Sequence, residues 1–251
     1  MTFIATMGRG FAALALLGLA SCASADPDDL SATDTTPGFN RAMHGFNLAL
    51  DRNVLRPAAQ GYDFVTPTLF KHLIGNGFSH LELPGDFVNY LLQGRIEPAL
   101  ETLGRFSVNT VVGAGGLLDP ATEAGLPKRP TDFGITLGRH GVAEGNYLVL
   151  PLFGPSTTRD AVGTVVDRAL HPLTYLGYIA PGLPPAAGIA LNVTERVDAR
   201  NRNADVIDDL LYESEDSYIS LRSVYLQRRR ALVAGEEGGA DALPDIFDQG
   251  N

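Results

Sequence analysis

The chain has 251 residues, of which 45% are hydrophobic and 19% charged, so it can bury a substantial core as one large domain or two small ones. Its formal net charge is -10, which leaves no broad basic face for phosphate groups and argues against nucleic acid as a partner. Twenty-eight glycines and 16 prolines predict many helix breaks rather than a few long bundles.

The N-terminus has the pattern of a bacterial export signal. Arg9 precedes a short apolar run over residues 11–19, which is too short to span a bilayer, and small residues lead from there to Cys22. Cys22 is the only cysteine, so it cannot form an internal disulfide. Its position resembles the lipoprotein box, in which the cysteine becomes the lipidated first residue. The alternative is a signal that is cleaved elsewhere and happens to contain a cysteine.

This pattern divides the chain into four expected segments. Residues 1–21 are a signal peptide, 22–37 a lipidated flexible tether with too little apolar content to pack, 38–234 a helical domain, and 235–251 an acidic, disordered tail. Acyl chains on the cysteine would tether the protein to a membrane without spanning it. Ala23 and Ser24 directly follow the cysteine, where lipoproteins retained in the inner membrane have an aspartate, and by that resemblance the outer membrane is favoured.

The first helix is predicted over residues 38–52, with residues 56–57 (Arg-Pro) ending it. Four apolar residues recur there at helical spacing and share one face: Phe39, Met43, Phe46 and Leu50. The next apolar segment, residues 62–74, contains Pro67 and predicts a short or broken helix that ends at the glycines of residues 75–77.

Two further helices precede a glycine-rich loop. Asp86 can cap the first, which ends at Gly94, and Pro98 fits the first turn of the second. The second helix runs into residues 111–118, where three glycines interrupt aliphatic side chains. Each glycine costs a helix up to about 1 kcal/mol relative to alanine, so we expect a loop or hinge with an apolar surface.

The middle of the chain predicts two strands and a capped helix. Residues 133–138 and 147–153 are apolar-rich and bounded by glycine or proline, although Pro151 demotes the second to an edge strand or extended loop. Thr157, three residues before Asp160, approximates a capping box for a helix of about ten residues. Residues 171–172 (His-Pro) end that helix.

The C-terminal part predicts two amphipathic helices. Apolar residues step by three or four over residues 189–211, and a last helix is expected over residues 217–233. Arg228, Arg229 and Arg230 lie in its last turns, where positive charge complements the helix dipole. The alternative for this triplet is contact with anionic headgroups or an acidic partner.

No catalytic constellation is visible in the sequence. The five histidines are scattered without an HExxH pair or cysteine cluster, so no metal site is predicted. Ser156 lacks the second glycine of a nucleophile elbow, and residues 113–116 follow a helix and lack the third glycine of a dinucleotide fingerprint. Asp86 and Asp119 are better explained as caps than as paired catalytic carboxylates.

Six groups of residues nevertheless occur in an order typical of one family. They are Phe39-Asn40-Arg41-Ala42-Met43; Val88-Asn89-Tyr90-Leu91-Leu92-Gln93-Gly94; Arg105-Phe106 with Asn109-Thr110; residues 113–119; Asp132-Phe133-Gly134 with Thr136-Leu137-Gly138; and Tyr147-Leu148-Val149-Leu150-Pro151 through Gly154-Pro155-Ser156-Thr157 with Arg159-Asp160. Together they resemble the VacJ/MlaA family of outer-membrane lipoproteins over about residues 39–230.

The resemblance implies a mainly α fold: a single flat, ring-like domain of short and amphipathic helices, with a small extended or β element, lying in the inner leaflet of the outer membrane. It implies transport without chemistry and without a cofactor. Phospholipid misplaced in the outer leaflet would enter a central amphipathic channel and pass to a soluble periplasmic carrier protein. This transport would maintain the lipid asymmetry of the outer membrane. It also implies association with a trimeric porin.

Five residues are candidates for the channel. We expect Gly113, Gly115 and Gly116 to flex and set its width, and the first helix, near Met43 and Asn47, to pack beside them. Core packing explains Met43 equally well. Alanine at Gly113 and Gly115 should then change lipid export while leaving the fold intact.

Two rival functions remain open. One is a structural lipoprotein that stabilises a porin or the envelope without transport. The other is a periplasmic hydrolase whose residues converge only in the fold.

Overall fold

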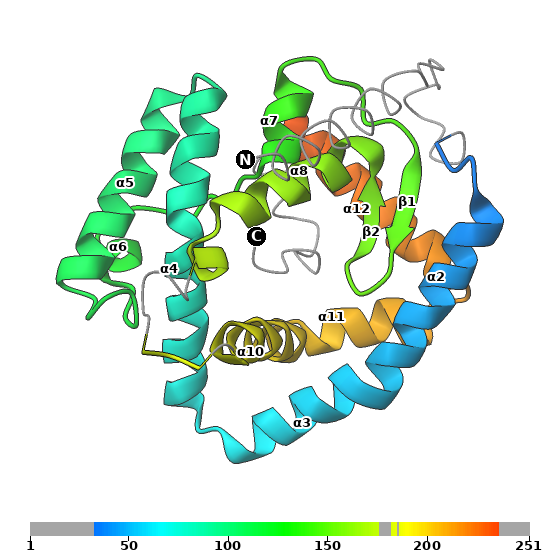
Figure 1. Cartoon of the computed structure of the whole chain (residues 1–251), viewed down its shortest axis with the longest axis horizontal. Coiled ribbons are helices and arrows are strands. Elements are labelled where there is room, and N and C mark those ends of the chain that lie inside the picture. The colour runs from blue at the N-terminus through cyan, green and yellow to red at the C-terminus, as the bar shows by residue number, and fades with distance from the viewer. Residues whose placement is uncertain (1–32, 176–181, 185, 236–251) are drawn as a thin grey trace, which may run out of the picture.

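The structure is a computed structural model that describes residues 33–175, 182–184 and 186–235. Cys22, the expected signal peptide, most of the tether and the acidic tail therefore lie outside the described residues. As expected, the described chain is mainly helical with one two-stranded sheet. Figure 1 shows the helices following one another around a ring, with the β-hairpin on its inner side. Within the described ranges, no helix is both long enough and apolar enough to cross a bilayer.

The chain enters the ring through one nearly continuous helical arm. α2 (Pro37–Leu50) passes through a π turn, η2 (Asp51–Leu55), into α3 (Arg56–Val65). The prediction that residues 56–57 end this helix is wrong. Pro57 lies in the first turn of α3, where its missing N–H costs little, and the Arg56 N–H donates to the Asp51 carbonyl across the wider π turn.

The left side of the ring in Figure 1 is an antiparallel helix pair. α4 (Thr68–Leu92) begins after Pro67 and is one helix of 25 residues, so the predicted break at residues 75–77 is wrong. The prediction that Asp86 caps a new helix is also wrong, because this carboxylate is buried inside α4 and accepts from the Thr131 N–H at 3.1 Å. α5 (Ile96–Val111) carries Pro98 in its first turn, as predicted.

After α5 the chain forms short elements. α6 (Pro120–Glu123) is capped by Asp119, as predicted. Residues 133–138 form a helix, α7 (Phe133–Arg139), rather than the predicted strand, because the Asp132 carboxylate accepts from the Ile135 N–H at 2.7 Å and starts a helical turn.

The second predicted strand is confirmed in part. β1 (Tyr147–Leu150) pairs antiparallel with β2 (Gly154–Thr157), and the turn between them contains Pro151. α8 (Thr158–Leu170) then starts at the predicted cap, where the Asp160 N–H donates to Thr157 Oγ1 at 3.2 Å. It ends before His171-Pro172, as predicted, and a 3-10 turn, η3 (Pro172–Tyr175), follows.

The C-terminal half closes the ring. The single long helix predicted over residues 189–211 is divided at Asn203 into α10 (Ala186–Arg202), α11 (Ala204–Asp208) and a π turn, η4 (Asp209–Glu213). α12 (Ser217–Ala234) confirms the last predicted helix.

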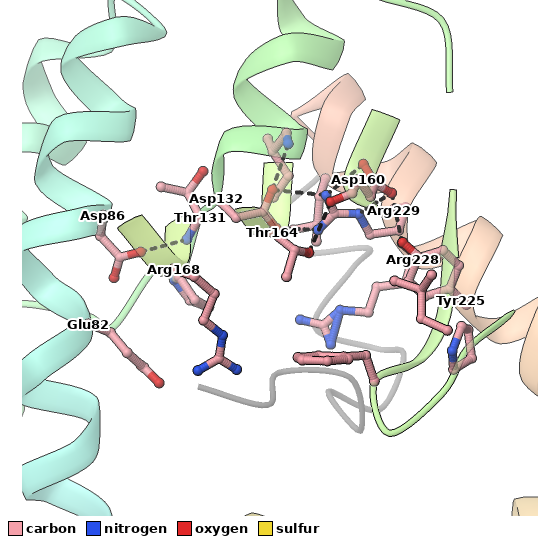
Figure 2. Close-up of a pocket in the computed structure, with 17 residues that line it drawn as sticks. Glu82, Asp86, Thr131, Asp132, Asp160, Thr164, Arg168, Tyr225, Arg228 and Arg229 are labelled. Carbon is pink, nitrogen blue, oxygen red and sulfur yellow. Dashed lines mark hydrogen bonds and ion pairs between the residues drawn. The ribbon is translucent and has the colours of Figure 1, made fainter. Parts of the chain in front are cut away.

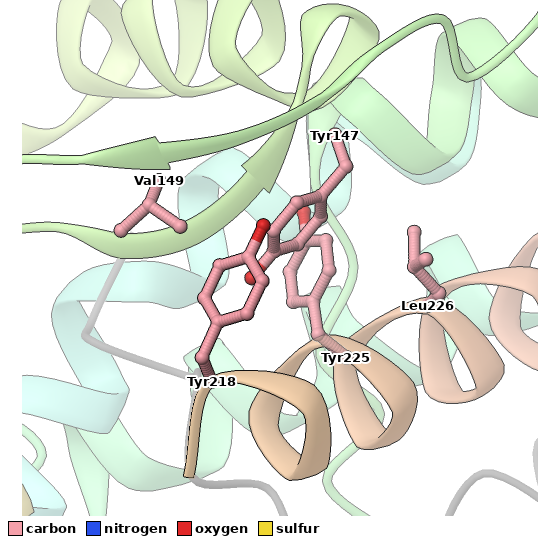
Figure 3. Packing of buried hydrophobic residues seen from close by; sticks show 5 residues of the cluster. All are labelled: Tyr147, Val149, Tyr218, Tyr225 and Leu226. Carbon is pink, nitrogen blue, oxygen red and sulfur yellow. The ribbon is translucent and has the colours of Figure 1, made fainter. Parts of the chain in front are cut away.

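The apolar core is small and lies where α12 meets the hairpin. Figure 3 shows three tyrosines there, Tyr147, Tyr218 and Tyr225, and the Tyr147 ring meets the other two edge-on at centroid distances of 6.1 and 6.5 Å. Met43 of α2 packs against this cluster. Many large apolar side chains instead remain exposed on the outer helices, and Phe64 is 91% exposed.

Candidate functional site

The structure does not bring the five predicted channel residues together. The glycine-rich loop at the end of α5 lies against α4, whereas Met43 and Asn47 lie on α2 across the ring (Figure 1). The prediction that the first helix packs beside the glycine loop is therefore wrong. The channel role of these residues stays a prediction.

The glycine loop is a hydrogen-bonded turn packed on α4. The Gly115 N–H donates to the Thr110 carbonyl at 3.1 Å, and the Leu118 N–H donates to the Gly113 carbonyl at 2.9 Å. A Cβ on Gly113 would lie 2.5 Å from backbone oxygens, and a Cβ on Gly116 would lie 2.2 Å from the His80 ring. Alanine at Gly113 therefore cannot leave the local fold intact, contrary to the expectation from sequence.

Asn47 joins α2 to the hairpin tip. Its side-chain Nδ2 donates to the Leu150 carbonyl at 2.9 Å, and its Oδ1 accepts from the Leu152 N–H at 2.8 Å. Leu152 has a positive φ of 71°, which residues other than glycine rarely adopt. These two bonds thus hold the hairpin turn in an uncommon conformation.

The hairpin tip separates two pockets on the inner side of the ring. The first, here called the polar pocket, lies between α4, α8, α12 and the hairpin. Figure 2 shows Glu82 and Asp86 of α4 on one side, Arg228 of α12 on the other and Arg168 of α8 between them. Charges of both signs therefore face one space.

One wall of the polar pocket is a buried ion network. Arg229 donates through Nε and Nη2 to Asp160 at 3.0 Å, and through Nη2 to Asp132 at 2.9 Å. The Tyr225 hydroxyl donates to Asp160 at 2.8 Å. Burial acts to raise the pKa of Asp160, but the charges of Arg229 and Arg159 outweigh it and hold that pKa well below its usual range. The network is therefore a fixed, charged wall.

Two arginines meet at the hairpin tip. The Cζ atoms of Arg168 and Arg196 lie 5.8 and 4.8 Å from the centre of the Phe153 ring. Burial lowers the pKa of Arg196, and the charge of Arg168 lowers it further. Arg168 donates to a neutral acceptor, the Asn192 amide oxygen, at 3.2 Å, and its Nε is buried without a hydrogen-bond acceptor among the described residues. The tip is thus a locus of positive charge that suits an anion.

The second pocket, here called the apolar pocket, lies between α2, α10, α11 and the same hairpin. Most of its lining is aliphatic: Leu48, Leu50, Leu55, Val149, Leu152, Ala199, Ile207, Leu211 and Leu221. Arg196 and Pro155 border it on the hairpin side. Because Pro155 also lines the polar pocket, a charged space and an apolar space adjoin along one hairpin.

Catalytic chemistry finds little support in this arrangement. Within the described ranges, no group of three His, Cys, Asp or Glu residues could hold a metal ion. His44 Nε2 and Ser217 Oγ are 2.8 Å apart, which is the distance of a base and a nucleophile. The adjacent carboxylate, Asp216, pairs with Arg41 and caps α12 instead of orienting the imidazole.

Comparisons with known proteins agree with the fold. The family model for MlaA lipoprotein matches residues 32–232. A relative from Shigella flexneri, named Intermembrane phospholipid transport system lipoprotein MlaA, is 36% identical over 224 residues, which are 87% of this chain and 86% of the relative. A relative of the same name from Haemophilus influenzae is 34% identical over 243 residues, 93% and 94% of the two chains. The chain belongs to the MlaA lipoprotein family.

A solved structure supports the family on the level of the fold. It comes from work on the structural basis for maintenance of bacterial outer membrane lipid asymmetry, and it matches with a TM-score of 0.68 at 35% sequence identity. The match covers 80% of this chain and 98% of the other. An uncharacterized protein of Rickettsia felis is 35% identical over 205 residues, 81% of this chain and 79% of the relative.

In this MlaA-family chain the three arginines at residues 228–230 have three different surroundings. Arg228 lines the polar pocket, Arg229 lies in the ion network with 12% of its side chain exposed, and Arg230 pairs with Glu144 at 2.6 Å. Neither a helix C-terminus nor a shared anion contact describes all three. Sequence reasoning missed Arg168 and Arg196 altogether, because only the fold brings α8, α10 and the hairpin tip together.

Proposed function

We propose that this chain is a lipoprotein of the outer membrane, anchored through Cys22 on the periplasmic side. It takes phospholipid misplaced in the outer leaflet through the centre of the ring and passes it to a soluble periplasmic carrier protein. In this way it maintains the lipid asymmetry of the outer membrane. The role requires no chemical reaction and no cofactor, and a trimeric porin holds the ring in the membrane.

The observation that carries this proposal is the pair of adjoining pockets of opposite polarity. A phospholipid joins an anionic phosphate to apolar acyl chains, and charge-assisted hydrogen bonds from guanidinium groups are strong phosphate contacts. Arg168 and Arg196 at the hairpin tip supply such groups. The aliphatic lining of the apolar pocket offers acyl chains a surface away from water. The names of the relatives from Shigella flexneri and Haemophilus influenzae point to the same cargo.

The exposed apolar side chains of the outer helices support a position among lipids. They include Phe64, Leu69 and Phe70 around the junction of α3 and α4, and Leu100 on α5. Large apolar side chains that gather on a protein surface mark sites of membrane or protein contact. A ring resting in the inner leaflet would place these side chains against acyl chains.

Deletion of the gene, followed by measurement of phospholipid in the outer leaflet, tests the proposal. An impermeant amine-reactive label on intact cells reports ethanolamine lipids at the surface. We expect more label in the deletion strain, return to the parental level with the wild-type gene, and failure of Cys22→Ser to restore it fully. An unchanged outer leaflet in the deletion strain would overturn transport.

The main alternative is a porin-associated envelope lipoprotein without transport activity. It predicts a porin complex of normal yield together with an unchanged outer leaflet. Co-purification of phospholipid with the wild-type protein separates the two functions, because only a transporter needs to hold its cargo.

A further inference from the structure

The polar pocket presents separate walls of opposite charge. On α4, Glu82 and Asp86 are four residues apart and so lie on one helical face, both lining the pocket. Arg168 and Arg228 approach from α8 and α12. A purely anionic ligand would place its charge near two carboxylates, whereas a ligand that carries both charges satisfies both walls.

The arginine side suits a phosphate diester. The Cζ atom of Arg168 lies 5.8 Å from the centre of the Phe153 ring, and its Nη1 donates to the Asn192 amide oxygen at 3.2 Å, so the planar guanidinium has two neighbours that position it. The charge of Arg196 on the same ring adds to the positive potential at the tip. A phosphate in the pocket would accept charge-assisted hydrogen bonds from the guanidinium of Arg168, which lines it.

The acidic side suits a small ammonium group. Lys128 Nζ lies 3.1 Å from Glu82 Oε2, and the Thr131 N–H donates to Asp86 Oδ1 at 3.1 Å. These two contacts each use one oxygen of the carboxylate. A carboxylate offers about four lone-pair sites, so a primary ammonium can bind beside the partners that each group already has. Lys128 offsets part of the negative charge of this pair, and an ammonium would add to that, whereas a neutral hydroxyl headgroup would not.

We propose that the polar pocket is a headgroup subsite that selects a zwitterionic phosphoethanolamine lipid over a phosphoglycerol lipid. The phosphate lies against Arg168 and Arg228, and the primary ammonium lies against Glu82 and Asp86. This inference rests on the proposed transport function and names its preferred substrate.

A competition experiment tests the preference. The purified full-length lipoprotein in detergent is incubated with equal amounts of phosphatidylethanolamine and phosphatidylglycerol of identical acyl chains, recovered, and its bound lipid is quantified by mass spectrometry. We expect about three- to tenfold enrichment of phosphatidylethanolamine. Glu82→Gln should lower the enrichment towards one. The matched control is Glu101→Gln, which removes a carboxylate paired with Arg129 outside the pocket and should leave the enrichment unchanged.

A second measurement needs no variant. Phosphatidylethanolamine with an acetylated amine keeps its phosphate but loses the positive charge, and it should compete no better than phosphatidylglycerol. Equal binding of the acetylated and free lipids would overturn the headgroup inference while leaving transport standing. A ratio of one between phosphatidylethanolamine and phosphatidylglycerol on the wild-type protein would do the same. Absence of any captured lipid would overturn the proposed function as well. Displacement of the lipid by an equimolar amount of soluble glycerophosphoethanolamine would assign the subsite to a soluble phosphodiester and also overturn it.

Discussion

Asp167 on α8 is held in surroundings that oppose its ionisation. Burial, and next the charge of Asp132, raise the pKa of Asp167 to about 7. The Phe133 N–H and the Asn89 amide donate to its oxygens at 3.0 to 3.1 Å and only partly offset these effects. The group therefore keeps its proton in the folded state over a pH range in which the unfolded chain has lost it.

This difference predicts a pH-dependent stability. In the unfolded chain this carboxyl has a pKa of about 3.9. The contribution of Asp167 to the free energy of unfolding is therefore complete below that pH. It is lost as pH rises to about 7, by up to about 1.4 kcal/mol per pH unit. Urea unfolding of the wild type and Asp167→Asn at pH 5 and pH 8 measures it. We expect the wild type to lose stability relative to the variant over this interval.

The wild type must be compared with Asp167→Asn at each pH because three histidines change the free energy of unfolding with pH in the opposite direction. Burial lowers the pKa values of His44, His80 and His171, so each of them favours the folded state as pH rises through about 6.5. The variant keeps all three. Parallel pH curves for the wild type and Asp167→Asn would show that Asp167 ionises normally.

The buried ion network makes a second prediction on the scale of residues. Asp160→Asn removes one of the two carboxylates that neutralise Arg229 and leaves a buried guanidinium undercompensated. We expect a loss of about 3–5 kcal/mol in the free energy of unfolding, measured in urea. Asp63→Asn breaks the exposed pair with Lys71 and serves as the control, with little expected change. Similar losses in both variants would contradict the network's role.

At the scale of elements, local signals in the sequence predicted what they control directly. The cap at Thr157, the turn at Gly94 and the end of α8 at His171 depend on neighbouring residues and were predicted correctly. The sequence did not predict that α4 is continuous, because this continuity depends on tertiary contacts. Gly75 lies within α4 where this helix packs on α10, and a Cβ there would meet the Asp198 carboxylate at an ordinary contact distance of 3.4 Å.

The same limit explains the strand predicted at residues 133–138 and the missed arginines. Gly134 and Gly138 of α7 allow Asp160 and Val233 to approach within about 3 Å of a Cβ position, a relation that no local pattern reveals. Arg168 and Arg196 belong to different helices and share only the Phe153 ring. The fold could be predicted from the resemblance to a family, whereas the residues that line the pockets are known only from the structure.

The glycine loop gives a prediction at this scale. Gly116 has a φ of 91°, and its missing side chain makes room for the His80 ring, which stacks on Phe106 at 4.8 Å. Gly116→Ala should therefore cost about 1–3 kcal/mol. Gly85→Ala in α4 is the matched control, since a Cβ there meets nothing within 4 Å. It should stabilise the helix by about 0.5–1 kcal/mol. Thermal unfolding compares the two, and equal midpoints would contradict the packing of Gly116 on His80.

On the scale of the whole molecule, the ring is closed by polar contacts more than by a large core. Asn40, Asn89, Thr157 and Asp198 are among its most buried side chains. Asn40 joins segments from both halves of the chain: its Nδ2 donates to the Tyr147 carbonyl at 3.0 Å, and its Oδ1 accepts from the Val149 N–H at 3.0 Å. It also donates to Asp34, which accepts from Arg222 of α12 at 2.8 Å. α2, β1 and α12 thus meet at one residue.

Asn40→Ala should therefore open the ring at this joint. Each buried backbone group left without a partner costs about 1–3 kcal/mol, and the loss falls on α2 and β1 rather than on the α4–α5 pair across the ring. Hydrogen–deuterium exchange followed by mass spectrometry should show faster exchange over residues 37–50 and 147–150, with unchanged protection over residues 68–111. Asn53→Ala, which removes only an exposed bond to the Ala49 carbonyl, controls for loss of an amide. Uniformly faster exchange in Asn40→Ala would instead mean that the whole ring unfolds as one unit, with no separate joint between its ends.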